Sequence, residues 1–332
     1  MNWLSGRRIS FVIVLACLLL CERCAIGIVL HPEGEPNLAT WTDRPDANVM
    51  GRWSSNASCV AISENAVITT RHQGGGIGTT VEIGGNSYLV ADVCNCGAAD
   101  LRIAELYAAN LECYAEVFTD TNEIGQEVVV SGYGDGRGGL LQTGGKTYGY
   151  SWDNSSNTTL RLGTNETDAV ADNNTVAGYT SDVVIADFDG LGEGGFTTYE
   201  AALGAHDSGG GWFIKVGDGW SLAGLSRAVE HSSESWFRNK MFPSVPDPDL
   251  IDGVRISSYS AWAIDNLPAY VAGDLSGDGW VDFTDFAVLS YYWGETCQSP
   301  GHCEGADFEP DGDVDGFDLL FLSERWLTGE EN

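Results

Sequence analysis

Three short segments of the chain carry side chains whose types and order could perform nucleophilic chemistry. The strand-like run "VITTRH" ends at His72, the run "AADLRIAEL" has Asp100 where an apolar strand begins, and the segment "GAHDSGGGWF" contains Ser208. A serine hydroxyl is a poor nucleophile until a neighbouring base removes its proton, and His72 would be that base. Asp100 would accept the hydrogen bond of the other ring nitrogen and fix the tautomer. We therefore expect His72, Asp100 and Ser208 to be catalytic.

Each of these segments also has an ordinary explanation when it is taken alone. The chain has 43 glycines in 332 residues, so a glycine-rich tetrapeptide could be a simple turn. A histidine after a strand is more often structural, and an aspartate before an apolar strand is commonly a turn residue. The three segments together, in this order, favour a triad.

Two acidic segments near the end of the chain form an internal repeat, "GDLSGDGWVDFTDFAVLSYYWG" and "ADFEPDGDVDGFDLLFLSERWL". Oxygen-bearing residues at loop positions 1, 3, 5, 9 and 12, with glycine at position 6, form a calcium-loop pattern, because this hard cation takes many oxygen ligands. Each loop runs into an apolar pattern of helical spacing, so we expect two calcium ions. The expected metal ligands are Asp274, Ser276, Asp278, Asp282, Asp285, Asp307, Glu309, Asp311, Asp315 and Asp318.

The start of the chain has the pattern of a secretory signal peptide. Arg7 and Arg8 precede the apolar residues 9–20, and this predicts that residues 1–27 are removed on export. This run of twelve residues is too short to span a hydrocarbon core of about 30 Å, so no transmembrane segment is expected in the mature chain. A lipoprotein signal ending at Cys17 is the minor alternative. The expected location is extracellular or at the cell surface.

The mature chain is strongly acidic. Removing residues 1–27 leaves 13 basic and 47 acidic residues, a net charge near −34. This charge argues against a nucleic acid or an anionic membrane as partner, and favours a solvated surface or bound cations. Disorder is excluded, because 43% hydrophobic and 11% aromatic residues are enough to build cores.

Six cysteines remain after residue 27, and an even number in an exported protein predicts disulfides. Cys297 and Cys303 are the expected pair. A zinc site at "CNC" is the rival for two others, but the usual paired spacing is absent and no histidine lies near. Three connectivities are open to the four that remain, which are Cys59, Cys94, Cys96 and Cys113.

The elements that must position these residues are mostly strands. Residues 28–267 contain many short alternating or β-branched runs separated by Gly, Asn and Asp turns, the pattern of an all-β sandwich or barrel. One short helix is expected at "SYSAWAIDNL". The composition changes near Pro268, where the acidic repeats begin, so we expect a second domain over residues 268–332.

The three motifs that contain His72, Asp100 and Ser208, together with their flanking residues, resemble those of the trypsin-like serine proteases. The segments "IGQEVVVSGYGDG", "SLAGLSRA" and "DGVRISSYSAWAIDNL" are similar to this family's strand between the barrels, its pocket strand and its closing strand and helix. The resemblance covers about residues 28–267. It implies two antiparallel β-barrels with a C-terminal helix, and a secreted serine endopeptidase that cleaves protein or peptide substrates through an acyl-enzyme.

The resemblance also implies supporting roles around the nucleophile. Backbone amides beside Ser208 would bind the oxyanion, and glycine after it lets the chain turn tightly. The serine on the pocket strand matches the family pattern. The residues implied are His206, Asp207, Gly209 and Ser226.

A free amino terminus is a further implication. Ala25 and Gly27 supply small residues at positions −3 and −1, so cleavage would fall before Ile28. In the family such an amine pairs with the aspartate before the nucleophile, here Asp207. We hypothesise that export itself activates the protein; the alternative is that Ile28 only begins the first strand.

Several positions depart from the family pattern. His206 stands where the family has a glycine whose amide forms half of the oxyanion hole, and a side chain there could be strained or could reorient the amide. Gln73 replaces a disulfide-forming cysteine, and Cys59 is displaced from that cysteine's usual partner. Ala202 replaces a charge at the base of the specificity pocket, and with Ala228 it implies a shallow apolar pocket for a small aliphatic side chain.

Residues 272–328 resemble a type I dockerin, a module that attaches its host enzyme to cohesin modules, often through Ser or Thr at loop positions 10 and 11. Here these positions hold Phe283 with Thr284, and Gly316 with Phe317. A cohesin-like partner and a calcium-stiffened stability cap are both open. The rival to a tethered protease is a catalytically inactive, protease-like binding protein at the cell surface.

Overall fold

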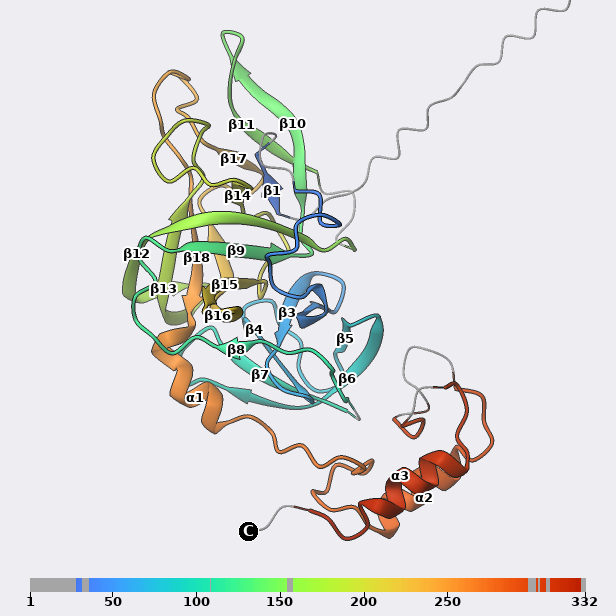
Figure 1. The fold of residues 1–332 in the computed structure, drawn as a ribbon. Coiled ribbons are helices and arrows are strands. Elements are labelled where there is room, and N and C mark those ends of the chain that lie inside the picture. The colour runs from blue at the N-terminus through green and yellow to red at the C-terminus, as the bar shows by residue number, and fades with distance from the viewer. Residues whose placement is uncertain are drawn as a thin grey trace, which may run out of the picture.

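The computed structural model describes residues 28–31, 36–107, 109–153, 158–297, 303, 305–308 and 311–329. The expected signal peptide, residues 1–27, and the expected calcium ligand Glu309 lie outside these residues. Figure 1 shows a large body built of strands and a smaller helical module at the C-terminal end of the chain.

The first barrel closes through six antiparallel strands in the order β2-β3-β4-β7-β6-β5. Strand β5 alternates buried apolar and exposed polar residues, because successive side chains point to opposite faces, whereas β3 and β4 are buried along their whole length. Trp53, Val67 and Val81 are among its buried core residues. The strands are β2 (Met50–Trp53), β3 (Ala57–Ala61), β4 (Ala66–Thr69), β5 (Thr80–Ile83), β6 (Asn86–Asn95) and β7 (Arg102–Leu106).

The second barrel is a sheet in the order β15-β9-β12-β13-β18-β16, closed by pairing of β15 with β16. The short strand β8 (Glu116–Val117) adds to β16 in parallel. The six strands of the second barrel are β9 (Glu127–Gly132), β12 (Arg161–Val176), β13 (Tyr179–Asp187), β15 (Gly211–Val216), β16 (Gly219–Val229) and β18 (Leu250–Arg255). The predicted architecture of two antiparallel β-barrels is confirmed.

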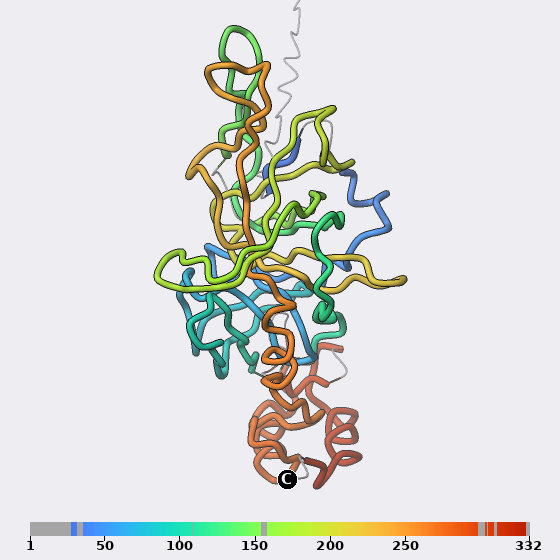
Figure 2. Tube along the Cα trace, turned by 90° about the vertical axis from the view of Figure 1, so that its left-hand side faces the viewer, coloured from blue at the N-terminus to red at the C-terminus, as the bar shows by residue number. Residues whose placement is uncertain are grey.

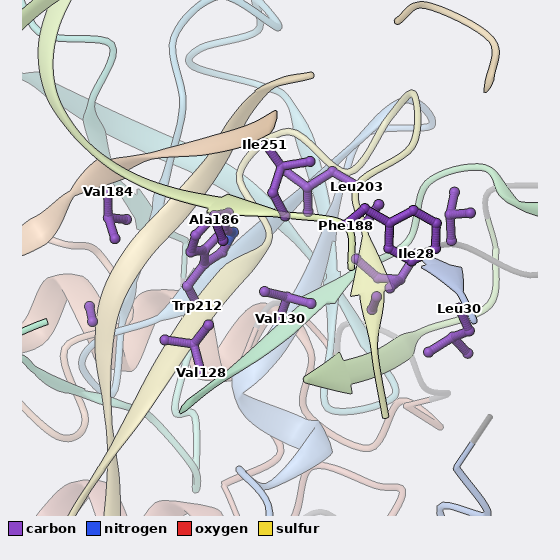
Figure 3. Packing of buried hydrophobic residues seen from close by; sticks show 14 of the residues in the cluster. Ile28, Leu30, Val128, Val130, Val184, Ala186, Phe188, Leu203, Trp212 and Ile251 are labelled. Carbon is purple, nitrogen blue, oxygen red and sulfur yellow. The ribbon is translucent and has the colours of Figure 1, made fainter. Parts of the chain in front are cut away.

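Two small sheets complete the body. One has the order β10-β11-β17, from β10 (Gly136–Thr143), β11 (Lys146–Asp153) and β17 (Glu234–Trp236). The other joins β1 (Val29–Leu30) to β14 (Ala201–Ala202), with Val29 opposite Ala202. This pairing packs Ile28 and Leu30 among the buried side chains of the second barrel, as Figure 3 shows.

The two barrels share one apolar core, which we call the seam. Val60 and Ile68 of the first barrel belong to the same buried cluster as Val129 and Phe213 of the second. The 3₁₀ helix Ile256–Tyr259 and helix α1 (Ser260–Asp265) follow the last barrel strand, as predicted. Within the described residues, no helix is both long and apolar enough to cross a membrane.

The C-terminal module contains helices α2 (Phe283–Tyr291) and α3 (Gly316–Glu324) around their own core. Each helix begins with a capping box: Asp282 caps α2 and Asp315 caps α3, and the aspartate three residues later bonds back to the cap's amide. Figures 1 and 2 both show this module at the end of the body where the first barrel lies.

Hydrogen bonds from Asn65 and Tyr107 join the module to the first barrel. Asn65 donates through Nδ2 to the carbonyl of Ala269 at 3.1 Å, and the Tyr107 hydroxyl donates to the carbonyl of Leu275 at 3.3 Å. The link between α1 and the first acidic loop is therefore fastened to the barrel at both ends of its course.

The expected disulfide between Cys297 and Cys303 is present. The expectation that the other cysteines also pair is wrong in this structure, since all four carry free thiols. Cys59 forms no disulfide because its side chain is wholly buried in the core of the first barrel, where it faces Gly51. Burial raises the pKa of this thiol far above its ordinary value, so it is inert as a nucleophile.

Candidate active site

The structure joins the three residues singled out by the sequence into one hydrogen-bonded chain. His72 Nε2 lies 2.8 Å from Ser208 Oγ, and His72 Nδ1 lies 2.6 Å from Asp100 Oδ2. His72 follows β4 and Asp100 precedes β7 in the first barrel, while Ser208 precedes β15 in the second. The three hydrogen-bonded side chains therefore come from both sides of the seam, and they meet only when both barrels are folded.

Asp100 is held rigidly by its surroundings. Its side chain is completely buried, and Oδ1 accepts the backbone amides of Arg71 and His72 at 2.7 and 2.8 Å. Its own amide donates to Ser181 Oγ at 2.9 Å. Because Oδ1 is taken by amides, Oδ2 is left to accept the proton on His72 Nδ1. This leaves Nε2 as the acceptor that faces Ser208.

We call residues 205–209, which carry Ser208, the nucleophile turn. Only glycine fits in this turn directly after the serine. Gly209 has φ of 81°, and a Cβ there would collide with the carbonyl of Ser58 and the hydroxyl of Thr69. The Ser208 carbonyl accepts the amide of Ser58 at 2.8 Å. Gly209 donates its amide to the carbonyl of Ser226 at 2.9 Å. Both barrels thus grip the backbone of the nucleophile turn.

Two backbone N–H groups beside the serine are left available. Among the described residues, the amides of His206 and Ser208 donate to no protein acceptor. His206 has φ of 70°, which is uncommon for a residue with a side chain. Its ring Nδ1 lies 3.0 Å from the carbonyl oxygen of Asn56.

Asp207 is fully buried under the nucleophile turn. Oδ2 accepts the amides of Gly204 at 2.7 Å and Ile28 at 3.3 Å, and Oδ1 accepts the amide of Gly134 at 2.8 Å. Burial raises the pKa of Asp207 to about 7, and these amides and Arg161 only partly oppose the rise. The hydrogen-bond donors to Asp207 are all neutral amides, and a buried carboxylate without a directly paired charge is costly, so this site favours a cation.

Ile28 itself is in an unfavourable conformation, with φ of 53°. For a β-branched residue this value is a genuine outlier. The torsion exists only while a peptide bond precedes Ile28, because φ is defined by the preceding carbonyl carbon. Cleavage before Ile28 would therefore remove the strain and place a charged amine beside Asp207.

The residues expected to form the specificity pocket lie on two different strands, and Ala202 shares its buried cluster with a larger side chain. Ala202 is buried on β14 and Ala228 is half-buried on β16. Ile251, opposite Val229 in the sheet, belongs to the same buried cluster as Ala202 and Trp212. Figure 3 shows Ile251 and Trp212 on strands of this barrel. Ile251 was missed from the sequence, because it reaches this cluster from β18, a strand distant in the chain.

Ser226 and Gln73 take part in the framework of the site. The Ser226 hydroxyl accepts Trp212 Nε1 at 3.0 Å, which fixes the strand that frames the nucleophile turn. Gln73 Nε2 donates to Thr69 Oγ1 and, at 3.4 Å, to the carbonyl of Ser58. Gln73 therefore holds the turn after His72 without a disulfide. Ser58 and Ser181 were missed from the sequence.

The two acidic loops have the main features that a calcium ion requires. Asp285 is fully buried with both oxygens turned into the first loop, and Asp318 does the same in the second. Gly279 and Gly312, at loop position 6, have φ of 88° and 103°. These oxygen donors and turns fit the cation.

The loop carboxylates now accept backbone amides of their own loops. Asp274 accepts those of Gly277 and Gly279, and Asp307 accepts those of Asp311 and Gly312. No three His, Cys, Asp or Glu side chains of the described residues converge closely enough to hold an ion.

Comparison with known proteins agrees with this description of the C-terminal module. Residues 272–327 match the family model of the dockerin type I domain. No curated protein sequence matches the chain. The chain is similar in structure to neuropsin, a serine protease expressed in the limbic system of mouse brain, with 15% identity, a TM-score of 0.44, and coverage of 66% of this chain and 94% of that chain. Residues 272–327 thus match the dockerin type I domain, and they follow a module of two antiparallel β-barrels.

Proposed function

We propose that the two-barrel module is a serine endopeptidase. The observation that carries this proposal is the hydrogen-bonded chain from Asp100 through His72 to Ser208 across the seam. In the reaction, His72 Nε2 takes the proton of Ser208 Oγ while that oxygen attacks the carbonyl carbon of a peptide bond. The Asp100 carboxylate stabilises the imidazolium that forms.

The remaining steps use the same groups. The amides of Ser208 and His206 would donate to the negatively charged oxygen of the tetrahedral intermediate. The His72 imidazolium then gives its proton to the leaving amine, and the peptide bond breaks to leave an acyl-enzyme on Ser208. Water, deprotonated by His72, attacks the ester carbon and frees the carboxylic acid and the serine.

The substrate is proposed to present a small aliphatic side chain at the cleaved bond. Ala202 offers no charge at the pocket base, so selection of Lys or Arg has no electrostatic support. Ile251 adds apolar bulk to the cluster that contains Ala202. A protein or peptide with Ala or a residue of similar size fits this lining best.

The amino terminus is proposed to switch the enzyme on. A cut before Ile28 would give an ammonium group at the position whose amide lies 3.3 Å from Asp207 Oδ2. Its charge would satisfy the buried carboxylate and so order the turn that carries His206 and Ser208. Removal of residues 1–27 on export would be that cut.

The C-terminal module is proposed to anchor the enzyme outside the cell or at its surface. Dockerin domains bind cohesins, and type I dockerins bind calcium, so a cohesin-like partner and two ions are proposed, with the acidic side chains of both loops as ligands. Calcium would supply positive charge that holds these carboxylates together. Phe283 and Phe317 are exposed at loop positions 10 and 11, which indicates an apolar contact with the partner. The contacts with Tyr107 and Asn65 support the alternative of a stability cap.

Labelling by a fluorophosphonate tests the catalytic proposal. The probe forms a bond to an activated serine, so the chain that starts at Ile28 should be labelled and its Ser208→Ala variant should not. Failure of a folded chain to react would favour the rival, an inactive binding protein at the cell surface.

A further inference from the structure

We propose that His206 is a positioning residue, whose ring is tethered to the carbonyl of Asn56 and thereby holds the His206 amide toward the reacting carbonyl oxygen. This inference rests on the proposed peptidase function. It assigns a role to a side chain that stands beside Ser208 but outside the Asp100–His72–Ser208 chain.

The backbone before His206 is fixed from one side. The Ala205 carbonyl accepts the amide of Asp135 at 2.7 Å. In a planar trans peptide, the carbonyl of one residue and the N–H of the next point in opposite directions. The bond from Asp135 therefore turns the N–H of His206 away from Asp135.

The ring fixes the backbone from the other side. His206 has φ of 70°, where a Cβ is poorly tolerated, so the residue needs a compensating contact to stay there. Nδ1 lies 3.0 Å from the oxygen of Asn56. A carbonyl oxygen can only accept, so Nδ1 carries the proton and Nε2 is the unprotonated nitrogen of the neutral ring.

The tether also joins the two barrels. Asn56 lies in the turn between β2 and β3 of the first barrel, and His206 lies on the nucleophile turn of the second. Two residues further along, Ser58 donates its amide to the carbonyl of Ser208 at 2.8 Å. The two contacts clamp one short stretch of backbone onto the other, so the His206 amide and Ser208 Oγ keep a fixed relation.

A series of three variants tests the role of the ring. His206→Ala removes the tether and keeps the Cβ, His206→Gly removes both, and His206→Asn keeps a side-chain N–H on a residue that tolerates positive φ. The first two should lower kcat about 10- to 1000-fold on a peptide substrate, the upper value being that of a lost oxyanion donor. KM and the melting temperature should change little, and His206→Asn should recover most of kcat. A kcat for His206→Gly at or above that of the unaltered chain would overturn the proposal.

A second measurement does not depend on activity. Nitrogen-15 NMR of the ring in the Ser208→Ala protein, assigned by comparison with a sample also carrying His206→Asn, should show the proton of the neutral ring on Nδ1. A proton on Nε2 would overturn the tether even in an active enzyme. Absence of fluorophosphonate labelling in the unaltered chain would instead refute the peptidase function and leave this NMR result to decide the tether.

Discussion

The contact between Ile28 and Asp207 leads us to predict that one extra residue before Ile28 lowers both stability and activity. A chain that starts at Ile28 places an ammonium beside the carboxylate, whereas a chain that starts at Gly27 places a neutral amide there. The amide donates at 3.3 Å in the present structure. The two forms differ by one glycine and so isolate the effect of the charge.

The magnitude follows from the burial of Asp207. With a neutral donor its pKa is raised from 3.8 to about 7, because burial disfavours the charged form. A rise of this size disfavours the ionised folded state by about 4 kcal/mol above pH 7. The folded chain binds the extra proton between pH 4 and 7, so the free energy of unfolding should fall as the pH rises through this window. An ammonium partner should abolish most of that fall.

Activity should respond on the same scale. Loss of one member of a buried ion pair costs about 3 to 5 kcal/mol, so the Gly27 form should react with a fluorophosphonate at least 100-fold more slowly at pH 7.5. Urea unfolding from pH 4 to 8 measures the stability difference. Asp207→Asn is the matched control, since it should make the two amino termini nearly equivalent. Equal labelling rates and parallel stability profiles in the Gly27 and Ile28 forms would refute the pairing.

Three further predictions concern the triad, the pocket and the helical module. His72→Ala and Asp100→Asn should each lower kcat by about 10⁴, because the triad acts as a unit and asparagine favours the wrong tautomer; near-normal turnover in either variant would contradict the assignment. Ile251→Gly should raise kcat/KM for a Leu substrate relative to an Ala substrate by at least about 10-fold, measured with matched peptides, and an unchanged ratio would remove Ile251 from the pocket. Calcium chelation should unfold residues 272–328 and leave the barrels folded, which limited proteolysis and circular dichroism would detect; a chelated module that resists protease would reject this.

The barrels and the grouping of His72, Asp100 and Ser208 were predictable because their evidence is local. The alternation in strands such as β5 and the glycine after Ser208 reflect constraints that act within a few residues. The order of the three motifs then restricts the fold. The repeat of the acidic loops was visible for the same reason.

The features that were missed from the sequence depend on contacts between distant parts of the chain. Ser181 bonds to Asp100 across 81 positions and Asn56 bonds to His206 across 150, so neither leaves a pattern in its own segment. Ile251 joins the buried cluster of Ala202 from the last barrel strand. The even number of cysteines was misleading, because a thiol such as that of Cys59 can be an ordinary apolar core group.

The hydrogen bonds from Asn65 and Tyr107 to the C-terminal segment limit how far an anchored enzyme could reach. A free link over residues 266–273 could extend by about 26 to 29 Å and let the barrels swing around their anchor. A link fastened at Ala269 and Leu275 allows little of this motion. The site around Ser208 would then face one fixed direction from the attachment point. The choice of substrate would depend on which proteins lie on that side, as well as on the residues that line the site.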